Sequence, residues 1–190
     1  MKRYAILFGL FALLGGCAQW TLVTPKRVSV GDLYSVQPDT NWNRLVIGHT
    51  EIWTFDGPLL QEVRFLKGLD EGDKFLPITA FSKKYEKMPS YKEGMTPIEV
   101  AEFIVASLSH SGMAKVETEN LRPAKVGGKS GFRFDLTFAL EKGLKKKGFA
   151  YGFLHDKKLH LIVYTAAQLH FYDRDSEKAE NLVRSIRFES

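Results

Sequence analysis

The feature that most constrains the fold is a run of strictly alternating residues at 132–140. Arg133, Asp135, Thr137 and Ala139 separate its apolar side chains, which are Phe132, Phe134, Leu136, Phe138 and Leu140. A period of two places all the apolar side chains on one face of a β-strand. Residues 149–154 and 159–165 also favour strands, and the polar residues 155–158 between them are typical of a hairpin turn. The sequence therefore predicts a three-stranded antiparallel meander.

Two helices are expected around this meander. Residues 96–110 begin with Thr96, Pro97 and Glu99, which together form a capping box with proline at the first helical position. The apolar residues of this segment recur at helical spacing, namely Val100, Phe103, Ile104 and Leu108. A last helix is predicted to begin at Asp173 or Asp175. Its apolar face consists of Ala179, Leu182, Val183 and Ile186.

The first half of the chain favours strands and turns. A first strand is expected at 28–36, and the turn formers at 37–41 follow it. Residues 51–55 and 59–66 predict a hairpin that is broken at Asp56-Gly57-Pro58. Residues 68–94 read as a long irregular excursion, which in a compact domain usually covers something or performs a function.

Strands joined by short turns favour an antiparallel sheet with helices packed on it, so the fold class is α+β. A length of 190 residues suits one such domain. The order of elements over roughly 28–188 resembles the PsbP-like α/β/α sandwich, which recurs in small envelope lipoproteins and extrinsic photosystem subunits. Residues 38–42 (PDTNW) stand where such proteins often have a P-x-G-W-like turn, although the glycine is missing here. The resemblance implies a binding or assembly module.

The N-terminus has the features of an export signal. Lys2 and Arg3 precede the apolar stretch 4–14, which is too short to span a bilayer as a helix. Leu14-Gly15-Gly16-Cys17 resembles the lipobox of bacterial lipoproteins, in which lipid is attached to the cysteine and the chain is cut just before it. The expected organisation is a signal peptide at 1–16, a tether at 17–27 and one domain at 28–190. An ordinary secreted protein is the alternative.

The lipobox resemblance implies a membrane anchor at Cys17 and a domain that faces the periplasm. Such lipoproteins carry two or three acyl chains, and stable anchoring needs at least two. Ala18, in place of aspartate, favours the outer membrane under the enteric sorting pattern. Cys17 is the only cysteine, so no disulfide within the chain is possible.

The charge pattern does not indicate nucleic-acid binding. The net charge of +5 includes Lys2 and Arg3 of the signal segment, and the remaining basic residues form no stripe. The expected partners are the membrane, through acylated Cys17, and a protein of the envelope.

Motifs for catalysis or cofactors are not complete. Residues 126–131 (VGGKSG) resemble a phosphate loop, but Pro123 occupies the position of its first glycine, so a turn between strands is expected. Phe132 likewise breaks the nucleophile-elbow pattern. The histidines have no metal-binding spacing, and we expect no metal, no cofactor and no enzymatic activity. His160 shares a strand face with Ile162 and Tyr164; we expect an exposed sheet face there, with a ligand or catalytic role as the alternative.

Two further sets of residues are candidates for binding. Trp53, Asp56 and Arg64 lie on or beside the Asp56-Gly57-Pro58 turn, where they form a binding rim or, for the aromatic residue, part of the core. The basic run Lys145, Lys146 and Lys147 is expected at a solvated hairpin tip. Its functional alternative is contact with anionic lipid headgroups.

The sequence favours a membrane-anchored, non-enzymatic interaction or assembly module. The alternatives are a small-ligand or lipid-binding protein with a pocket under residues 68–94, and a hydrolase with an unrecognised site. A filled core with an exposed patch would favour the first function. A deep apolar pocket would favour the second, and a buried titratable pair in a cleft would favour the third.

Overall fold

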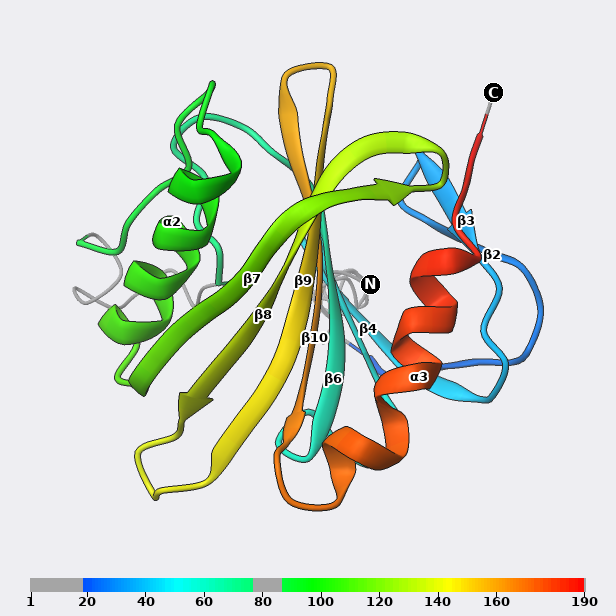
Figure 1. Ribbon diagram of the computed structural model, residues 1–190. Coiled ribbons are helices and arrows are strands. Elements are labelled where there is room, and N and C mark those ends of the chain that lie inside the picture. The colour runs from blue at the N-terminus through cyan, green and yellow to red at the C-terminus, as the bar shows by residue number, and fades with distance from the viewer. Residues whose placement is uncertain (1–18, 77–86, 190) are drawn as a thin grey trace, which may run out of the picture.

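A computed structural model describes residues 19–76 and 87–189 of the chain (Figure 1). Eight antiparallel strands form the main sheet, in the order β1-β4-β5-β6-β10-β9-β8-β7. The N-terminal half supplies β1 (Thr21–Val23), β4 (Trp42–Ile47), β5 (Thr50–Thr54) and β6 (Gln61–Leu69). The C-terminal half supplies β7 (Ala114–Val126), β8 (Lys129–Ala139), β9 (Lys145–His155) and β10 (Lys158–Ala167).

The helices α2 (Pro97–His110) and α3 (Phe171–Arg184) lie on opposite sides of this sheet. A smaller sheet lies on the α3 side and pairs β2 (Val28–Val30), β3 (Tyr34–Val36) and β11 (Arg187–Phe188). The expected α+β class, with an antiparallel sheet and helices packed on it, is confirmed.

Alternation along the strands fills a separate core on each face of the sheet. Phe132, Phe134 and Leu136 of β8 pack under α2, together with Leu161 and Val163 of β10. The alternate residues of β10, Ile162 and Tyr164, point to the other face and pack under α3. Two fully buried tryptophans, Trp42 and Trp53, belong to the same core. Because both faces are covered, β10 is buried along nearly its whole length.

The expected helices and turns are largely confirmed. The capping box of α2 is present, with Thr96 as the N-cap and Glu99 as its partner. The β9–β10 hairpin turns at Asp156 and Lys157, both with positive φ, as a two-residue turn of this type requires. Residues 126–131 hold the β7–β8 turn, with Gly127 and Gly128 at positive φ, and not a phosphate loop.

The N-terminal strands differ from the expectation. Residues 28–36 form two strands, β2 and β3, because Gly31 adopts a φ of 61° and reverses the chain. Residues 21–23 were expected in the tether, but they already pair with β4 as β1. The ordered domain therefore begins at least seven residues earlier than the sequence predicted.

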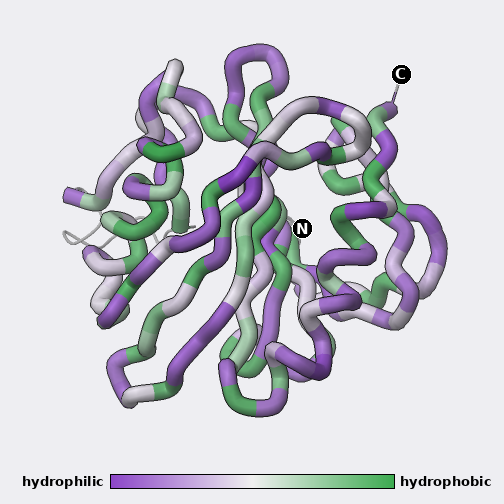
Figure 2. The backbone as a smooth tube through the Cα atoms, in the orientation of Figure 1, coloured by the Kyte–Doolittle hydropathy of each residue, from purple (hydrophilic) through white to green (hydrophobic). Residues whose placement is uncertain are grey.

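The strand β7 was not expected, because its sequence is polar and contains Pro123. It forms one edge of the main sheet and is largely exposed. Figure 2 shows the mostly hydrophilic character of its residues. Its pairing with β8 is interrupted twice, near Lys115 and near Asn120, and both residues have positive φ. Charged side chains, a proline and bulges are features that keep an edge strand from pairing with another chain. None of the described helices is long and apolar enough to cross a membrane.

Candidate functional site

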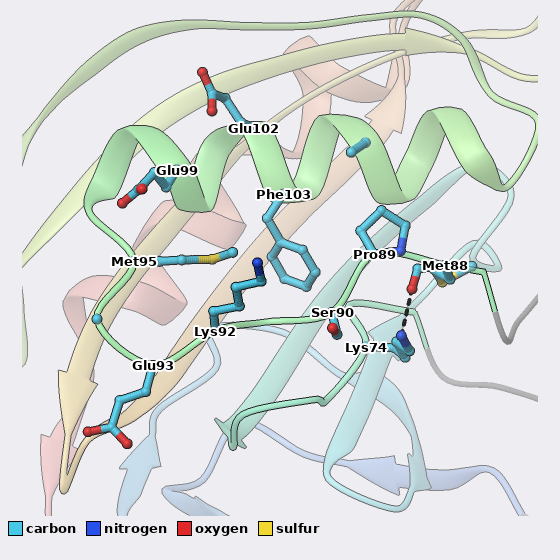
Figure 3. A pocket seen from close by; sticks show the side chains of 12 residues that line it. Lys74, Met88, Pro89, Ser90, Lys92, Glu93, Met95, Glu99, Glu102 and Phe103 are labelled. Atoms are coloured by element: carbon cyan, nitrogen blue, oxygen red, sulfur yellow. Dashed lines mark hydrogen bonds between the residues drawn. The ribbon is translucent and has the colours of Figure 1, made fainter.

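An open groove of about 770 Å³ runs beside α2, and we call it the α2 groove (Figure 3). One wall is the first part of α2, and the other is the segment 88–95. The residues that line it are Lys74, Met88, Pro89, Ser90, Lys92, Glu93, Gly94, Met95, Glu99, Glu102, Phe103 and Ala106.

The wall at 88–95 is fixed by hydrogen bonds to the segment that follows β6. The N–H of Gly72 donates to the carbonyl of Tyr91 at 2.9 Å, and the N–H of Tyr91 donates to the carbonyl of Asp73 at 2.8 Å. The ammonium of Lys74 donates to the carbonyl of Met88. These bonds hold the two segments side by side without a regular strand.

The wall formed by α2 is fixed at its first turn. The N–H of Thr96 donates to the Glu99 carboxylate at 2.7 Å, and the Thr96 hydroxyl donates to it at 2.8 Å. These hydrogen bonds lower the pKa of Glu99, so the carboxylate stays charged at the positive end of the helix dipole. The start of the groove is therefore set by local capping chemistry.

The floor of the groove is apolar. Phe103 points from α2 toward the opposite wall, and its ring lies 6.4 Å from that of Phe75 in an edge arrangement. Met88 and Met95 add two flexible thioether side chains. Methionine adapts to differently shaped partners and is frequent on surfaces that bind proteins.

Charges of both signs surround this floor. Lys92 comes from the 88–95 wall and Glu102 from α2, so the two walls differ in charge at these positions. Glu93 forms an exposed ion pair with Lys157 of the β9–β10 turn at 3.4 Å. The groove thus combines an apolar floor with a charged rim, as protein interfaces do.

A second hollow, of about 40 Å³, lies between α2 and the sheet. Its walls include Leu108, Met113 and Phe138, and an ion pair between Glu62 and Arg64 lies at its edge with a length of 2.8 Å. Pockets for small molecules measure roughly 300–1,000 Å³, so this hollow has room for only a few waters. A pocket under residues 68–94 was a possibility raised by the sequence, and the described part of that excursion borders the open α2 groove instead.

The residues predicted to form a binding rim are not brought together. Trp53 is fully buried, and its indole N–H donates to the Glu51 carboxylate at 3.2 Å. Arg64 is the next position after Val63, the cross-strand partner of Trp53, and therefore projects from the opposite face of the sheet. Trp53 is therefore part of the core, which was the alternative to the binding rim. The period of two also separates its side chain from that of Arg64.

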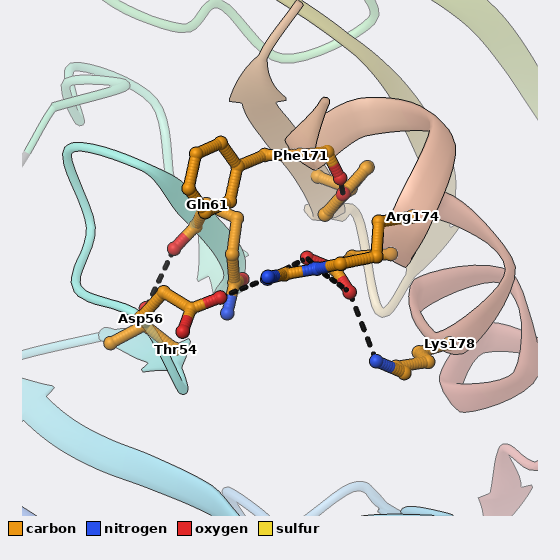
Figure 4. Close-up of polar contacts among 8 residues, drawn as sticks. Thr54, Asp56, Gln61, Phe171, Arg174 and Lys178 are labelled. Atoms are coloured by element: carbon orange, nitrogen blue, oxygen red, sulfur yellow. Dashed lines mark hydrogen bonds and ion pairs between the residues drawn. The ribbon is translucent and has the colours of Figure 1, made fainter. Parts of the chain in front are cut away.

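Asp56 connects the β5–β6 turn to α3 (Figure 4). Its carboxylate pairs with the guanidinium of Arg174, which also binds the buried Asp175 at 2.9 Å. Lys178 donates to Asp175 at 2.9 Å as well. This arrangement holds the start of α3 against the β5–β6 turn. The carboxylate of Asp56 therefore has a structural role, as the partner of Arg174.

His160 is buried and not on an exposed sheet face, so that expectation is wrong. Its ring stacks on Phe153 at 4.9 Å with an angle of 10° between the planes. Burial, together with the positive charges of the neighbouring His155 and Lys158, lowers the pKa of His160 to about 4. The imidazole is therefore neutral at pH 7 and acts as a core aromatic side chain.

The basic run 145–147 lies in β9 and not at a hairpin tip. Lys146 is buried, and its ammonium donates to the carbonyls of Pro58 at 3.2 Å and Leu59 at 2.9 Å. Lys147 lies over the ring of Tyr172 at 4.6 Å. Only Lys145 of the three is exposed, so a shared contact with headgroups is excluded for Lys146.

Cys17, the predicted anchor, lies outside the described residues. Within the described ranges, no three histidine, cysteine, aspartate or glutamate side chains are grouped so as to hold a metal ion. The α2 groove was not predicted from the sequence. Two of its lining residues were named from the sequence, Glu99 for the capping box and Phe103 for the apolar face of α2. The methionines at 88 and 95 were the sequence signal for a binding surface.

Comparisons with solved structures agree with the fold. No protein-family model matches the sequence, and no curated protein matches it. Among solved structures, the chain is similar to the solution structure of cyanobacterial PsbP (CyanoP) from Synechocystis sp. PCC 6803. The TM-score is 0.51 at 10% identity, over 96% of this chain and 99% of that one.

A second solved structure, LpqN of Mycobacterium tuberculosis, involved in cell envelope biogenesis, aligns with a TM-score of 0.37 at 11% identity. That alignment covers 93% of this chain and 88% of that one. The expected PsbP-like fold is confirmed by the likeness to CyanoP.

Proposed function

We propose that this PsbP-like domain is a non-enzymatic interaction module of the bacterial envelope. Acylated Cys17 anchors it, in the outer membrane, with the domain facing the periplasm, and a partner protein binds in the α2 groove. The observation that carries the binding role is the groove itself, which is open, has walls held by hydrogen bonds and is apolar at its floor.

The rest of the described interior supports binding at a surface over binding in a cavity. Both faces of the sheet are filled by buried side chains, and the hollow between α2 and the sheet is too small for a ligand. Ser90 is a hydroxyl side chain in the groove, but the described residues that line the groove include no histidine to activate it and no cysteine. Its chemistry therefore suits recognition better than nucleophilic catalysis.

The lining also indicates what kind of partner segment fits. An apolar side chain of the partner inserts between Met95 and Phe103, where it is shielded from water. On one side of this apolar anchor, Lys92 contacts a negative charge of the partner. On the other side, Glu102 contacts a positive charge of the partner. A few buried apolar anchors with a polar rim account for most of the affinity of such interfaces.

The anchor is tested by growing cells with radioactive palmitate and isolating the protein. Wild type takes up label, and Cys17→Ser takes up none and leaves the membrane fraction. If wild type remains unlabelled, the anchored lipoprotein is excluded. Because Cys17 is the only cysteine, no other thiol can take up the acyl chain.

The groove is tested by placing a photo-crosslinking amino acid at single positions in cells. Lys92 and Glu102 report the groove, and the exposed Glu177 of α3 serves as the matched control. We expect a discrete crosslinked product at 92 and 102, reduced several-fold by Met95→Asp, and none at 177. Equal products at all three positions, or a product insensitive to Met95→Asp, would contradict the proposal.

A further inference from the structure

One edge of the main sheet exposes apolar side chains, where β1 pairs with the first half of β4. The exposed fractions are 42% for Trp20, 65% for Leu22, 44% for Val46 and 37% for Ile47. Pairing with β1 covers β4 only from Trp42 to Arg44, so the last residues of β4 lie at the rim of the sheet. We call Trp20, Leu22, Val46 and Ile47 the β1 edge.

The register brings these side chains together. Thr21 pairs with Arg44 and Leu22 with Asn43, so the chain before Thr21 runs alongside the end of β4. Leu22 lies opposite Asn43 and on the same face of the sheet. Ile47, four residues after Asn43 in β4, lies on that face as well. Val46 projects from the other face at the same rim, so the edge is apolar on both sides.

The segments that build this edge carry no negative charge at the surface. Residues 19–31 and 40–50 contain no aspartate or glutamate, and they include Lys26, Arg27 and Arg44. Glu51, which follows, is fully buried and forms ion pairs with Arg44 and Lys67. An apolar edge without acidic groups is complementary to a bilayer with anionic headgroups.

The position of the edge in the chain identifies the surface that covers it. Only three residues separate Cys17 from Thr21, the first residue of β1. A fully extended chain of this length reaches about 14 Å. A domain held so closely keeps the edge nearest to the anchor against the headgroups, and tryptophan is the residue type enriched at that depth.

We propose that the β1 edge is the surface with which this domain lies on the lipid bilayer. The proposal rests on the anchor at Cys17 and adds the orientation of the domain. The opposite edge, β7, then faces away from the membrane. Because α2 contacts β7, the α2 groove stays accessible to a protein in the periplasm.

The test uses the full lipidated chain reconstituted into vesicles of phosphatidylethanolamine and phosphatidylglycerol. With Cys17 acylated, a single introduced cysteine can be labelled with a fluorophore. Ile47→Cys reports the β1 edge, and Leu121→Cys on β7 is the matched control, since these side chains are 37% and 38% exposed. Flotation of the vesicles shows separately whether the protein is anchored.

We expect brominated lipids to quench the label at 47 several-fold more than the label at 121, and aqueous iodide to do the reverse. Tryptophan fluorescence gives a second readout, because Trp42 and Trp53 are fully buried. Quenching of this fluorescence by brominated lipids should be seen in wild type and lost in Trp20→Phe. If the protein floats but both labels are quenched alike, the orientation is wrong and the anchor stands. A label at 47 shielded from iodide and from brominated lipid indicates a protein contact and overturns the proposal. If the protein does not float, both the anchor and the orientation fail.

Discussion

The carboxylate of Glu51 lies 2.8 Å from the guanidinium of Arg44, on the neighbouring strand of the main sheet. Both side chains are on the α3 face, where they are diagonal neighbours across the β4–β5 pair. The ammonium of Lys67 lies 2.9 Å from the same carboxylate, which is fully buried. One buried negative charge is thereby shared by two cations.

The substitution Glu51→Gln should strongly destabilise the domain, because it leaves two cations without their partner. Removing one partner of a buried pair costs about 3–5 kcal/mol. The free energy of unfolding, measured with urea, checks this. Glu119→Gln on the exposed face of β7 is the control and should change stability by less than about 0.5 kcal/mol. Equal stabilities of the two variants would contradict the prediction.

Glu51 should also make the domain acid-sensitive. Burial alone would raise its pKa, but the hydrogen bonds from Arg44 and Lys67 outweigh burial and lower it. The stabilisation is therefore complete above the unfolded pKa of glutamate, about 4.3, and is lost as pH falls through the lower folded pKa. Urea unfolding measured from pH 5 downward should show a steeper loss in wild type than in Glu51→Gln. Parallel curves would exclude Glu51 as the cause.

His160 should add a second pH dependence at higher pH. Its folded pKa is about 4, while an unfolded histidine titrates near 6.5, so the unfolded chain binds more protons between these values. Stability should therefore fall by about 3 kcal/mol as pH is lowered from 6.5 to 4. His160→Phe should remove this slope, whatever its constant effect on packing. Phe153→Leu removes the stacked ring but keeps the histidine, so this variant should retain most of the dependence of stability on pH.

The substitution Lys146→Met should destabilise the β5–β6 turn. The ammonium donates to the carbonyls of Pro58 and Leu59, and methionine fills similar volume without a donor. Loss of hydrogen bonds that a charged group donates costs about 1.5–3 kcal/mol. Lys145→Met is the neighbouring control and should have almost no effect, because Lys145 is exposed. The urea midpoint of unfolding should be lower for Lys146→Met than for Lys145→Met, and equal midpoints would contradict the prediction.

The substitution Thr96→Ala should loosen the start of α2 and, with it, one wall of the groove. Loss of an N-cap costs about 1 kcal/mol. Hydrogen exchange at the amides of the first helical turn should rise in Thr96→Ala and remain near wild type in Thr96→Ser, which keeps the hydroxyl. Faster exchange in both variants would mean that the methyl group, and not the cap, holds the helix.

Local signals predicted much of the fold. The capping box at Thr96 and the alternation at 132–140 each depend on neighbours within a few residues, and both are present. The β5–β6 and β9–β10 hairpins were also predicted, because their turns are short and carry turn-forming residues. The strand β7 was missed, since an exposed edge strand needs no apolar face.

The candidate site was less predictable, because its parts meet only in the folded chain. Phe103 was recognised as an apolar helix residue, yet nothing local indicates that the 88–95 segment lies opposite it. Trp53 and Arg64 are close in sequence to one turn, but adjacent strands present them on opposite faces. His160 was expected on an exposed face, and α3 with the small sheet covers that face.

By itself, the sequence determined the strands with alternating side chains, the capped helix, the tight turns and the export and lipobox pattern. These follow from hydrogen bonds and side-chain periods that act over a few residues. Only the tertiary structure decided that β1 pairs with β4, that both faces of the sheet are covered and that a groove opens beside α2. These features depend on contacts between distant segments, whose free energy no short stretch of sequence contains.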